Sequence, residues 1–172
     1  ETAINENEKV LILYGDVPLI SKNTLKDLCL LNDSISILTT NLIKPTGYGR
    51  VIKDAKILVV EIIEEKDTNA EQKEIKEIFT GVMAINGKIL KELLPSINNK
   101  NASKEYYLTD LIGIAYSNRF KIETLSVSWE ETLGANTRSE QEKLEQIYRK
   151  MKNEDLLKKG ITLIDKSRVD VR

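Results

Sequence analysis

The 172-residue sequence contains no histidine and only one cysteine, Cys29. The lack of histidine excludes imidazole general bases, His-based catalytic triads and every His-containing zinc site. A lone cysteine excludes an internal disulfide, and its place among Leu25, Leu28 and Leu31 predicts a small buried hydrophobic residue, as in a reducing compartment. Any catalysis must therefore use oxygen ligands, charge and positioning.

Long apolar runs and a large net charge of either sign are also missing. No run approaches the length needed to span a bilayer, and the polar residues 1–9 show no signal-peptide pattern, so we expect a cytoplasmic protein without membrane contact. The net charge is −1, from 26 Lys and Arg against 27 Asp and Glu. These charges are interspersed along the chain, which argues against nucleic acid as a partner. The remaining composition, 41% hydrophobic and 31% charged, predicts a globular domain with its own core.

Apolar periodicity and turn residues predict alternating strands and helices. The strands are expected at 10–14, 34–43, 51–52, 57–63, 79–85 and 122–127. The helices are expected at 21–31, 71–78, 87–94, 105–117 and 139–159, the last one long and amphipathic. This alternation favours the α/β class with a mixed, mostly parallel sheet, and it predicts one β-α-β unit over 10–43.

The most informative segment is the apolar run from Val10 that ends in Gly15-Asp16 before Pro18. A continuous apolar run predicts a strand buried on both faces, which places Asp16 at the carboxyl end, where open parallel sheets bind ligands. A carboxylate there can hold a divalent metal. The alternative is that Asp16 only tightens a turn, a common role for Asp beside Gly and Pro.

Six motifs then occur in an order that is typical of one enzyme family. They are Tyr14-Gly15-Asp16-Val17-Pro18-Leu19-Ile20, Pro45-Thr46-Gly47-Tyr48-Gly49-Arg50, Ile63-Glu64-Glu65-Lys66-Asp67, Thr80-Gly81, Glu105-Tyr106-Tyr107-Leu108-Thr109-Asp110 and Gly134-Ala135-Asn136-Thr137-Arg138. From Lys9 onward the chain resembles the uridylyltransferase half of the bifunctional N-acetylglucosamine-1-phosphate uridylyltransferase and glucosamine-1-phosphate acetyltransferase.

The resemblance implies a Rossmann-like nucleotide-diphospho-sugar transferase fold that lacks its first β-α-β portion. It implies the C-terminal part of a nucleotidyltransferase domain at 1–138, a linker helix at 139–160, and the start of a truncated left-handed β-helix at 161–172. The implied reaction joins UTP and N-acetylglucosamine 1-phosphate to give UDP-N-acetylglucosamine, a peptidoglycan precursor, and pyrophosphate. Such in-line phosphoryl chemistry depends on charge neutralisation by Mg²⁺ and on orientation, and it needs no nucleophilic side chain.

The resemblance also implies a metal site. Asp16 matches the catalytic Mg²⁺ ligand, and Asn136 matches the residue that supplies a second oxygen to the same ion. One carboxylate and one amide are adequate because Mg²⁺ keeps waters and phosphates in its shell. The alternative for Asn136 is a left-handed turn residue beside Gly134.

Four further positions match contacts to the nucleotide sugar. Tyr14 and Gly15 match positions near the bound ligand, where a glycine lets the backbone come close. Gly49 matches a backbone contact to the N-acetylglucosamine moiety, and Glu64 matches a carboxylate that binds sugar hydroxyls. The alternatives are a plain loop glycine and a solvated charge. Tyr106 and Thr109 belong to a motif near the sugar pocket, although core packing explains the tyrosine equally well.

The chain departs from the family pattern at two places. Phe79 stands where the family usually has an asparagine whose amide contacts the sugar nucleotide. The triphosphate-binding loop Leu-Ala-Ala-Gly-x-Gly-Thr-Arg-Met does not occur upstream of Val10. Three hypotheses stay open. The chain is part of a uridylyltransferase that works with an N-terminal portion in the same or a separate chain, it is a non-catalytic remnant, or it is a sugar-nucleotide binding module.

Overall fold

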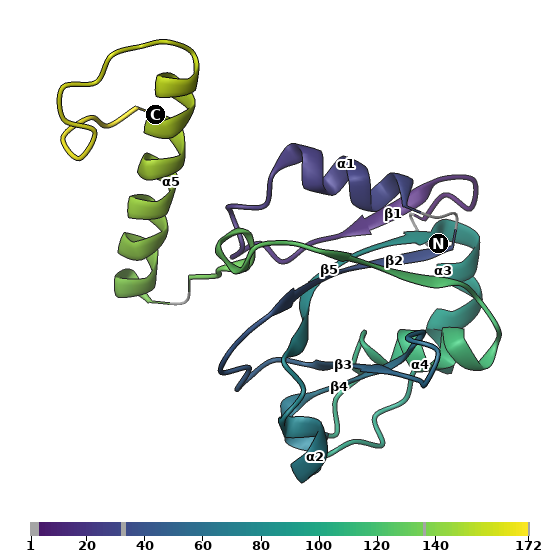
Figure 1. Cartoon of the computed structure of the whole chain (residues 1–172). Helices are drawn as coiled ribbons and strands as arrows, with labels where there is room; N and C mark the ends of the chain where they lie inside the picture. The colour runs from purple at the N-terminus through teal and green to yellow at the C-terminus, as the bar shows by residue number, and fades with distance from the viewer. Residues whose placement is uncertain (1–3, 32–33, 136, 172) are drawn as a thin grey trace. The chain divides into compact units, whose positions relative to one another are not determined.

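A six-stranded sheet organises most of the molecule (Figure 1). The computed structural model describes residues 4–31, 34–135 and 137–171. The strands are β1 (Lys9–Ile12), β2 (Ile35–Asn41), β3 (Arg50–Lys53), β4 (Val59–Ile63), β5 (Glu77–Asn86) and β6 (Ile122–Ser126). The α-helices are α1 (Lys22–Leu30), α2 (Ala70–Lys73), α3 (Gly87–Leu93), α4 (Asp110–Ser117) and α5 (Arg138–Lys158). Short 3₁₀ turns are η1 (Glu65–Asp67), η2 (Leu94–Ser96) and η3 (Trp129–Thr132).

The strand order is β4-β3-β5-β2-β6, and β1 also pairs with β5. β5 runs antiparallel to β1, β2 and β3, and β3 runs antiparallel to β4, whereas β2 and β6 are parallel. The α/β class is confirmed, but the prediction of a mostly parallel sheet is wrong. β1 and β2 do run in the same direction, as a crossover through α1 requires, but β5 lies between them and reverses both pairings.

One edge of β5 changes partner along its length. Arg50 of β3 pairs with Ile78, and Ile12 of β1 pairs with Met83, while β2 follows the opposite edge. Gly81 lies between the two contacts with a positive φ of 85°. The strand therefore departs from regular extended geometry where β3 gives way to β1.

Helices cover both faces of the sheet. α1 packs on β2 and β5 from one face, and α3 and α4 lie on the other (Figure 1). The main core lies under α3 and α4 and consists of buried apolar side chains from strands and helices. It comprises Ile35, Ile37, Val51, Val59, Ile62, Phe79, Met83, Ile85, Leu90, Leu93, Leu111, Ile112 and Ala115.

Predicted helix starts agree with the structure where a capping side chain is present. Ser21 accepts a hydrogen bond from the Thr24 amide at 3.0 Å and starts α1. Asn86 caps α3. Thr137 and Glu140 form a capping box at the start of α5, within one residue of the predicted helix.

Tertiary packing overrides four local predictions. The helix predicted over 71–78 is replaced by the shorter α2, which ends at Lys73. The predicted helix could not reach Ile78, because this residue is fully buried as part of β5. The helix predicted over 105–117 begins at Asp110. The residues of β1 are only half-buried, since within the described chain this strand pairs with β5 alone. Cys29 is likewise half-buried.

The chain divides into two compact units. The sheet unit comprises the described residues up to Tyr14 together with Ser21–Trp129, and the helix unit comprises Gly15–Ile20 with the chain from Glu130 onward. In the helix unit, the Asn153 amide donates to the carbonyls of Lys166 at 2.6 Å and Val169 at 2.9 Å, which holds the C-terminal segment along α5. Residues 161–171 form turns and bends, and their assignment to a β-helix stays a prediction.

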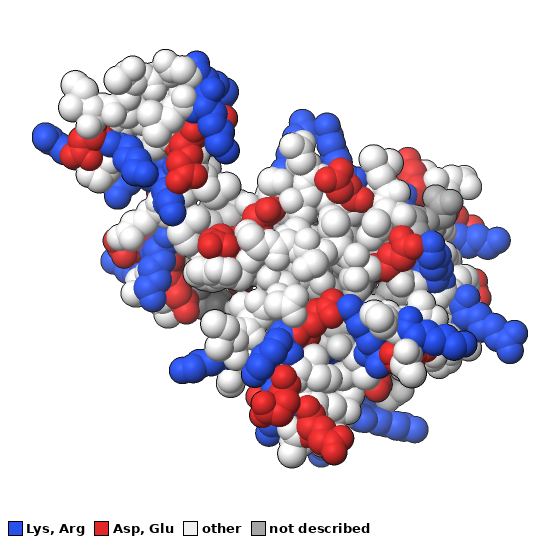
Figure 2. Space-filling view, in the orientation of Figure 1, with Lys and Arg blue, Asp and Glu red and all other residues white. Residues whose placement is uncertain are grey.

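None of the described helices is both long and apolar enough to cross a membrane. On the surface shown in Figure 2, Lys and Arg side chains lie among Asp and Glu side chains. This intermixing agrees with the net charge of −1.

Candidate functional site

Gly49 and Glu64 come together at the end of the β3–β4 hairpin. Arg50 pairs with Ile63 in the antiparallel register, so the residue before β3 lies beside the residue after β4. A Cβ atom added to Gly49 would lie 2.9 Å from Cγ2 of Ile62 and 3.5 Å from Oε2 of Glu64. The missing side chain therefore lets the backbone approach the carboxylate closely.

Thr109 orients the Glu64 carboxylate. Its Oγ1 donates a hydrogen bond of 2.8 Å to Oε1 of Glu64, and only 3% of Thr109 is exposed. Thr109 immediately precedes α4, so the helix that packs over the core also fixes this hydroxyl. The bond occupies one carboxylate oxygen and leaves Oε2 on the side of Gly49.

The same corner carries additional negative charge. Burial raises the pKa of Asp110, and the nearby charges of Asp67 and Glu64 raise the pKa further. Asp67 also accepts a hydrogen bond of 2.9 Å from the Ala102 amide. A surface of this sign favours hydroxyl donors, such as those of a sugar, over phosphate groups.

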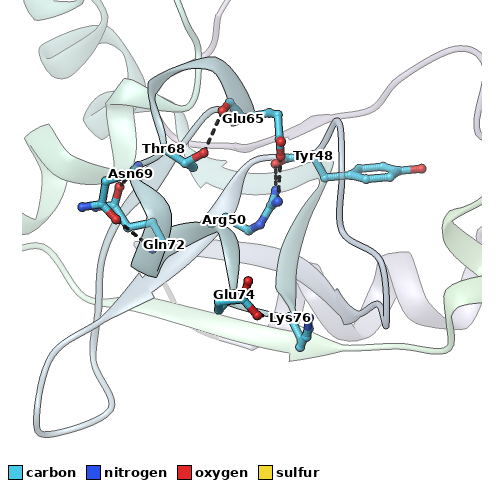
Figure 3. A network of polar contacts seen from close by, with 8 residues as sticks. All are labelled: Tyr48, Arg50, Glu65, Thr68, Asn69, Gln72, Glu74 and Lys76. Atoms are coloured by element: carbon cyan, nitrogen blue, oxygen red, sulfur yellow. Dashed lines mark hydrogen bonds and ion pairs between the residues drawn. The ribbon is translucent and has the colours of Figure 1, made fainter.

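The buried Arg50 side chain connects the residues that precede β3 with those that follow β4 (Figure 3). Its Nη2 lies 2.7 Å from Oε2 of Glu65, and its Nη1 donates to the carbonyl oxygen of Tyr48. Only 1% of Arg50 is exposed. The hydrogen bond from Arg50 is the main cause that lowers the pKa of Glu65, against the opposing effect of burial, and the Arg50 charge and a backbone bond from Gly47 lower it further.

Tyr14 lies against Gly81 of β5. A Cβ atom on Gly81 would fall 2.0 Å from Cε2 of the Tyr14 ring, so only glycine admits the ring in this position. Tyr14 remains 52% exposed. The Thr80-Gly81 motif therefore supports an aromatic ring that is still half accessible to a ligand.

Asp16 lies in a cavity of the helix unit. Its backbone carbonyl accepts a hydrogen bond of 3.1 Å from the Ala135 amide, and a Cβ atom on Gly134 would lie 3.5 Å from its Oδ2. The cavity of about 680 Å³ is lined by residues of the Gly15 loop and of the α5 start. These are Gly15, Asp16, Pro18, Leu19, Ala135, Thr137, Arg138, Gln141, Leu144, Glu145 and Tyr148.

Of the two predicted Mg²⁺ ligands, only Asp16 belongs to the residues that the structure describes. Ala135 and Thr137 line the cavity, but Asn136 between them lies outside the described residues. Among the residues that the structure describes, no group of three His, Cys, Asp or Glu side chains could hold a metal. The Asp16 carboxylate borders an open cavity and fits a hard cation that takes its remaining oxygens from other donors.

The five predicted site residues that the structure describes thus divide between the two units. Tyr14, Gly49 and Glu64 belong to the sheet unit, which brings Gly49 and Glu64 into contact. Gly15 and Asp16 belong to the helix unit. The role of each residue in binding stays a prediction.

Sequence reasoning missed three supporting residues. It gave no role to Gly81 or Arg50, and it placed Thr109 only near the pocket. Arg50 is a charged residue at the start of the apolar β3, directly after Gly49, and this position could have indicated that its side chain is buried and paired. Phe79 is 6% exposed and belongs to the hydrophobic core, so this position contributes to packing here.

No protein-family model matches the chain. The bifunctional protein GlmU of Hydrogenovibrio crunogenus is 44% identical over 172 residues, which covers 98% of this chain and 38% of that protein. The chain is a relative of a segment of GlmU. The GlmU of Alcanivorax borkumensis is 42% identical over 171 residues, with 97% and 38% coverage. The chain therefore spans well under half the length of these GlmU relatives.

A solved structure shares the fold. It is assigned as a glucose-1-phosphate thymidylyltransferase from Bacillus anthracis in complex with a sucrose, and it superposes with a TM-score of 0.54. The match covers 94% of this chain and 58% of the other, at 14% identity. The similarity to this structure and to GlmU confirms the predicted nucleotide-sugar transferase fold.

Proposed function

We propose that the chain supplies the sugar- and metal-binding part of an N-acetylglucosamine-1-phosphate uridylyltransferase. The reaction joins UTP to N-acetylglucosamine 1-phosphate and gives UDP-N-acetylglucosamine and pyrophosphate. Six ordered motifs support the proposal, as does 44% identity to a segment of GlmU. The rest of the nucleotide site, including the triphosphate loop, would come from an N-terminal portion in the same chain or in a separate one.

The contact among Gly49, Glu64 and Thr109 carries the proposal. A sugar ring presents hydroxyl donors, and an ionised carboxylate accepts from them strongly. The Thr109 bond fixes the Glu64 carboxylate before any ligand arrives, and Gly49 lets its backbone lie close to Oε2, so both groups can face the same ligand. An acceptor fixed in advance loses little entropy on binding.

Asp16 is the residue of this chain that would hold Mg²⁺, with Asn136 as the proposed second ligand. When bound, the ion neutralises phosphate charge. Gly15 lines the same cavity and leaves it open because it has no side chain. Tyr14 would contact the nucleotide sugar through its exposed ring face.

A chimeric enzyme tests the proposal. This chain replaces the matched segment of Hydrogenovibrio crunogenus GlmU, and pyrophosphate release from UTP and N-acetylglucosamine 1-phosphate is measured with Mg²⁺. We expect release by the chimera. Asp16→Asn should lower kcat by about a hundredfold, and Glu64→Gln should raise KM for the sugar phosphate by about tenfold.

The unchanged parent GlmU is the positive control for the assay. Glu74→Gln is the matched control for the carboxylate variants, because the Glu74 side chain is 84% exposed and forms only a 4.0 Å ion pair. A folded chimera that releases no pyrophosphate, while its parent does, would overturn the proposal.

A second candidate is a binding module without turnover. Phe79 favours it, because its buried ring contributes to the core and cannot offer the amide that the family places there. Binding of UDP-N-acetylglucosamine by a silent chimera, measured by calorimetry, would support this alternative.

A further inference from the structure

We propose that Arg50 is a positioning residue for the sugar subsite: its guanidinium sets the distance between the Gly49 backbone and the Glu64 carboxylate. This inference rests on the proposed function. The Arg50 guanidinium forms its hydrogen bonds with neither of these two groups. It acts on their chain neighbours, Tyr48 and Glu65 (Figure 3).

The connectivity makes this coupling direct. The Tyr48 carbonyl belongs to the peptide group next to Gly49, and Glu65 directly follows Glu64. Arg50 therefore holds the residue before one site residue and the residue after the other.

Stability alone is a weak explanation for so buried an ion pair. Only 2% of the Arg50 side chain and 27% of the Glu65 side chain are exposed, and Arg50 Nε is buried without a hydrogen-bond partner among the described residues. Taking a guanidinium out of water is costly, and apolar side chains of similar volume often serve stability as well or better. The planar fork of arginine instead fixes two acceptors at one geometry.

Two backbone hydrogen bonds also hold these two strand ends. The Phe79 amide donates to the Gly49 carbonyl at 2.9 Å, and the Asp67 amide donates to the Glu64 carbonyl at 2.9 Å. These two amides report on the positions of Gly49 and Glu64 without any ligand. If Arg50 sets the geometry, both bonds should loosen when the fork is lost.

The first experiment is amide hydrogen exchange on the full chain, comparing Arg50→Lys and Arg50→Met with Lys53→Met. Lys53 is the matched control because it forms the other ion pair of β3, at 2.6 Å to Glu77, away from Gly49. We expect exchange at Phe79 and Asp67 to speed up by about tenfold or more in both Arg50 variants. Lys53→Met should leave these two amides unchanged.

The second experiment measures kinetics of the same variants in the GlmU chimera. Arg50→Lys should raise KM for N-acetylglucosamine 1-phosphate by about tenfold while KM for UTP changes little. Arg50→Lys retains the charge, so it keeps the experiment informative if Arg50→Met fails to fold.

The two experiments separate the two proposals. Exchange at Phe79 and Asp67 that matches the Lys53→Met control would overturn the positioning role, whatever the kinetics show. An equal rise in KM for both substrates would overturn it as well. The chimera could release no pyrophosphate while amide exchange at Phe79 and Asp67 is faster in the Arg50 variants. This result would overturn the proposed function and leave the positioning role of Arg50 supported.

Discussion

The two units hold their key carboxylates in different ways. In the sheet unit, Glu64 accepts a hydrogen bond from Thr109, and its neighbour Glu65 pairs with the buried Arg50. In the helix unit, Asp16 borders an open cavity, and among the described residues its carboxylate has no side-chain partner. In the proposed function, Glu64 would accept from sugar hydroxyls and would benefit from being fixed in advance, whereas Asp16 as a metal ligand would need its oxygens available.

The units also differ in how much they bury. The sheet unit contains a core of 13 apolar side chains, while in α5 only Leu144 and Asn153 are buried. Rigid positioning of side chains requires neighbours that cannot move independently. The sheet unit provides such neighbours, and the helix unit relies more on helix capping and on the Asn153 bonds.

The largest expected effect tests this difference in burial. Leu111→Ala removes a fully buried side chain and should lower the free energy of unfolding by about 2–5 kcal/mol, because the site cannot collapse around the cavity. Leu157→Ala in α5, where 42% of the residue is exposed, should cost less than about 1 kcal/mol. Urea unfolding of both variants measures the values. Equal losses would show that the two units are packed alike.

The next effect concerns two glycines of positive φ, one in each unit. Gly81→Ala should cost about 2–4 kcal/mol of unfolding free energy, since it combines backbone strain with a clash against the Tyr14 ring. Gly160 has a φ of 84°, and a Cβ atom added there would meet no atom within 4 Å. Gly160→Ala should therefore lower the free energy of unfolding only through backbone strain, by about 1 kcal/mol.

A double variant sharpens this comparison. Tyr14→Ala combined with Gly81→Ala should recover the part of the loss that is due to the ring, as measured by a double-mutant cycle in urea. A loss at Gly81 that is independent of Tyr14 would contradict the contact between these residues.

The smallest effect is a pH dependence of opposite sign in the two units. The pKa of Asp110 is raised above 3.8 chiefly by burial, so its charged form disfavours folding above the folded-state pKa, and this penalty is absent below 3.8. Asp110→Asn should therefore raise the free energy of unfolding at pH 7 by less than about 1 kcal/mol, and the gain should shrink towards pH 4.

Asp165 of the helix unit provides the opposite case. Hydrogen bonds from Ser167 hold its pKa below 3.8, so its charged form favours folding above that value. Asp165→Asn should lower stability at pH 7, and the loss should fade as the pH drops through the folded-state pKa. Chemical unfolding at several pH values between 3 and 7 measures both variants. Profiles of the same sign would contradict the assigned environments.

Several elements were predictable because their signals are local. Ser21, Asn86 and Thr137 start helices through bonds to amides two or three residues away, and α5 agrees with its prediction within one residue. The β3–β4 hairpin follows from two short apolar runs around a polar turn. The family resemblance assigned Gly49 and Glu64 separately to contacts with the sugar, and only the structure shows that the two residues are neighbours.

Other features were not predictable, because distant residues decide them. Ile78 lies within a predicted helix, yet burial between β2 and β3 makes it part of β5. Periodicity also cannot show that β5 inserts between β1 and β2, so it predicted parallel neighbours where the sheet has antiparallel ones. The Arg50 pair with Glu65 joins residues 15 positions apart, and the register of the β3–β4 hairpin brings them together.

The sequence by itself determined the helix caps, the hairpin, the α/β class and, through six ordered motifs, the relation to a known enzyme family. These features depend on short-range hydrogen bonding and on the alternation of apolar residues along the chain. Only the tertiary structure decided which strands pair beyond the hairpin, which charges are buried, and which hydroxyl orients Glu64. Such contacts join residues far apart in sequence, and burial of apolar surface and satisfaction of buried polar groups select them only once the whole sheet has formed.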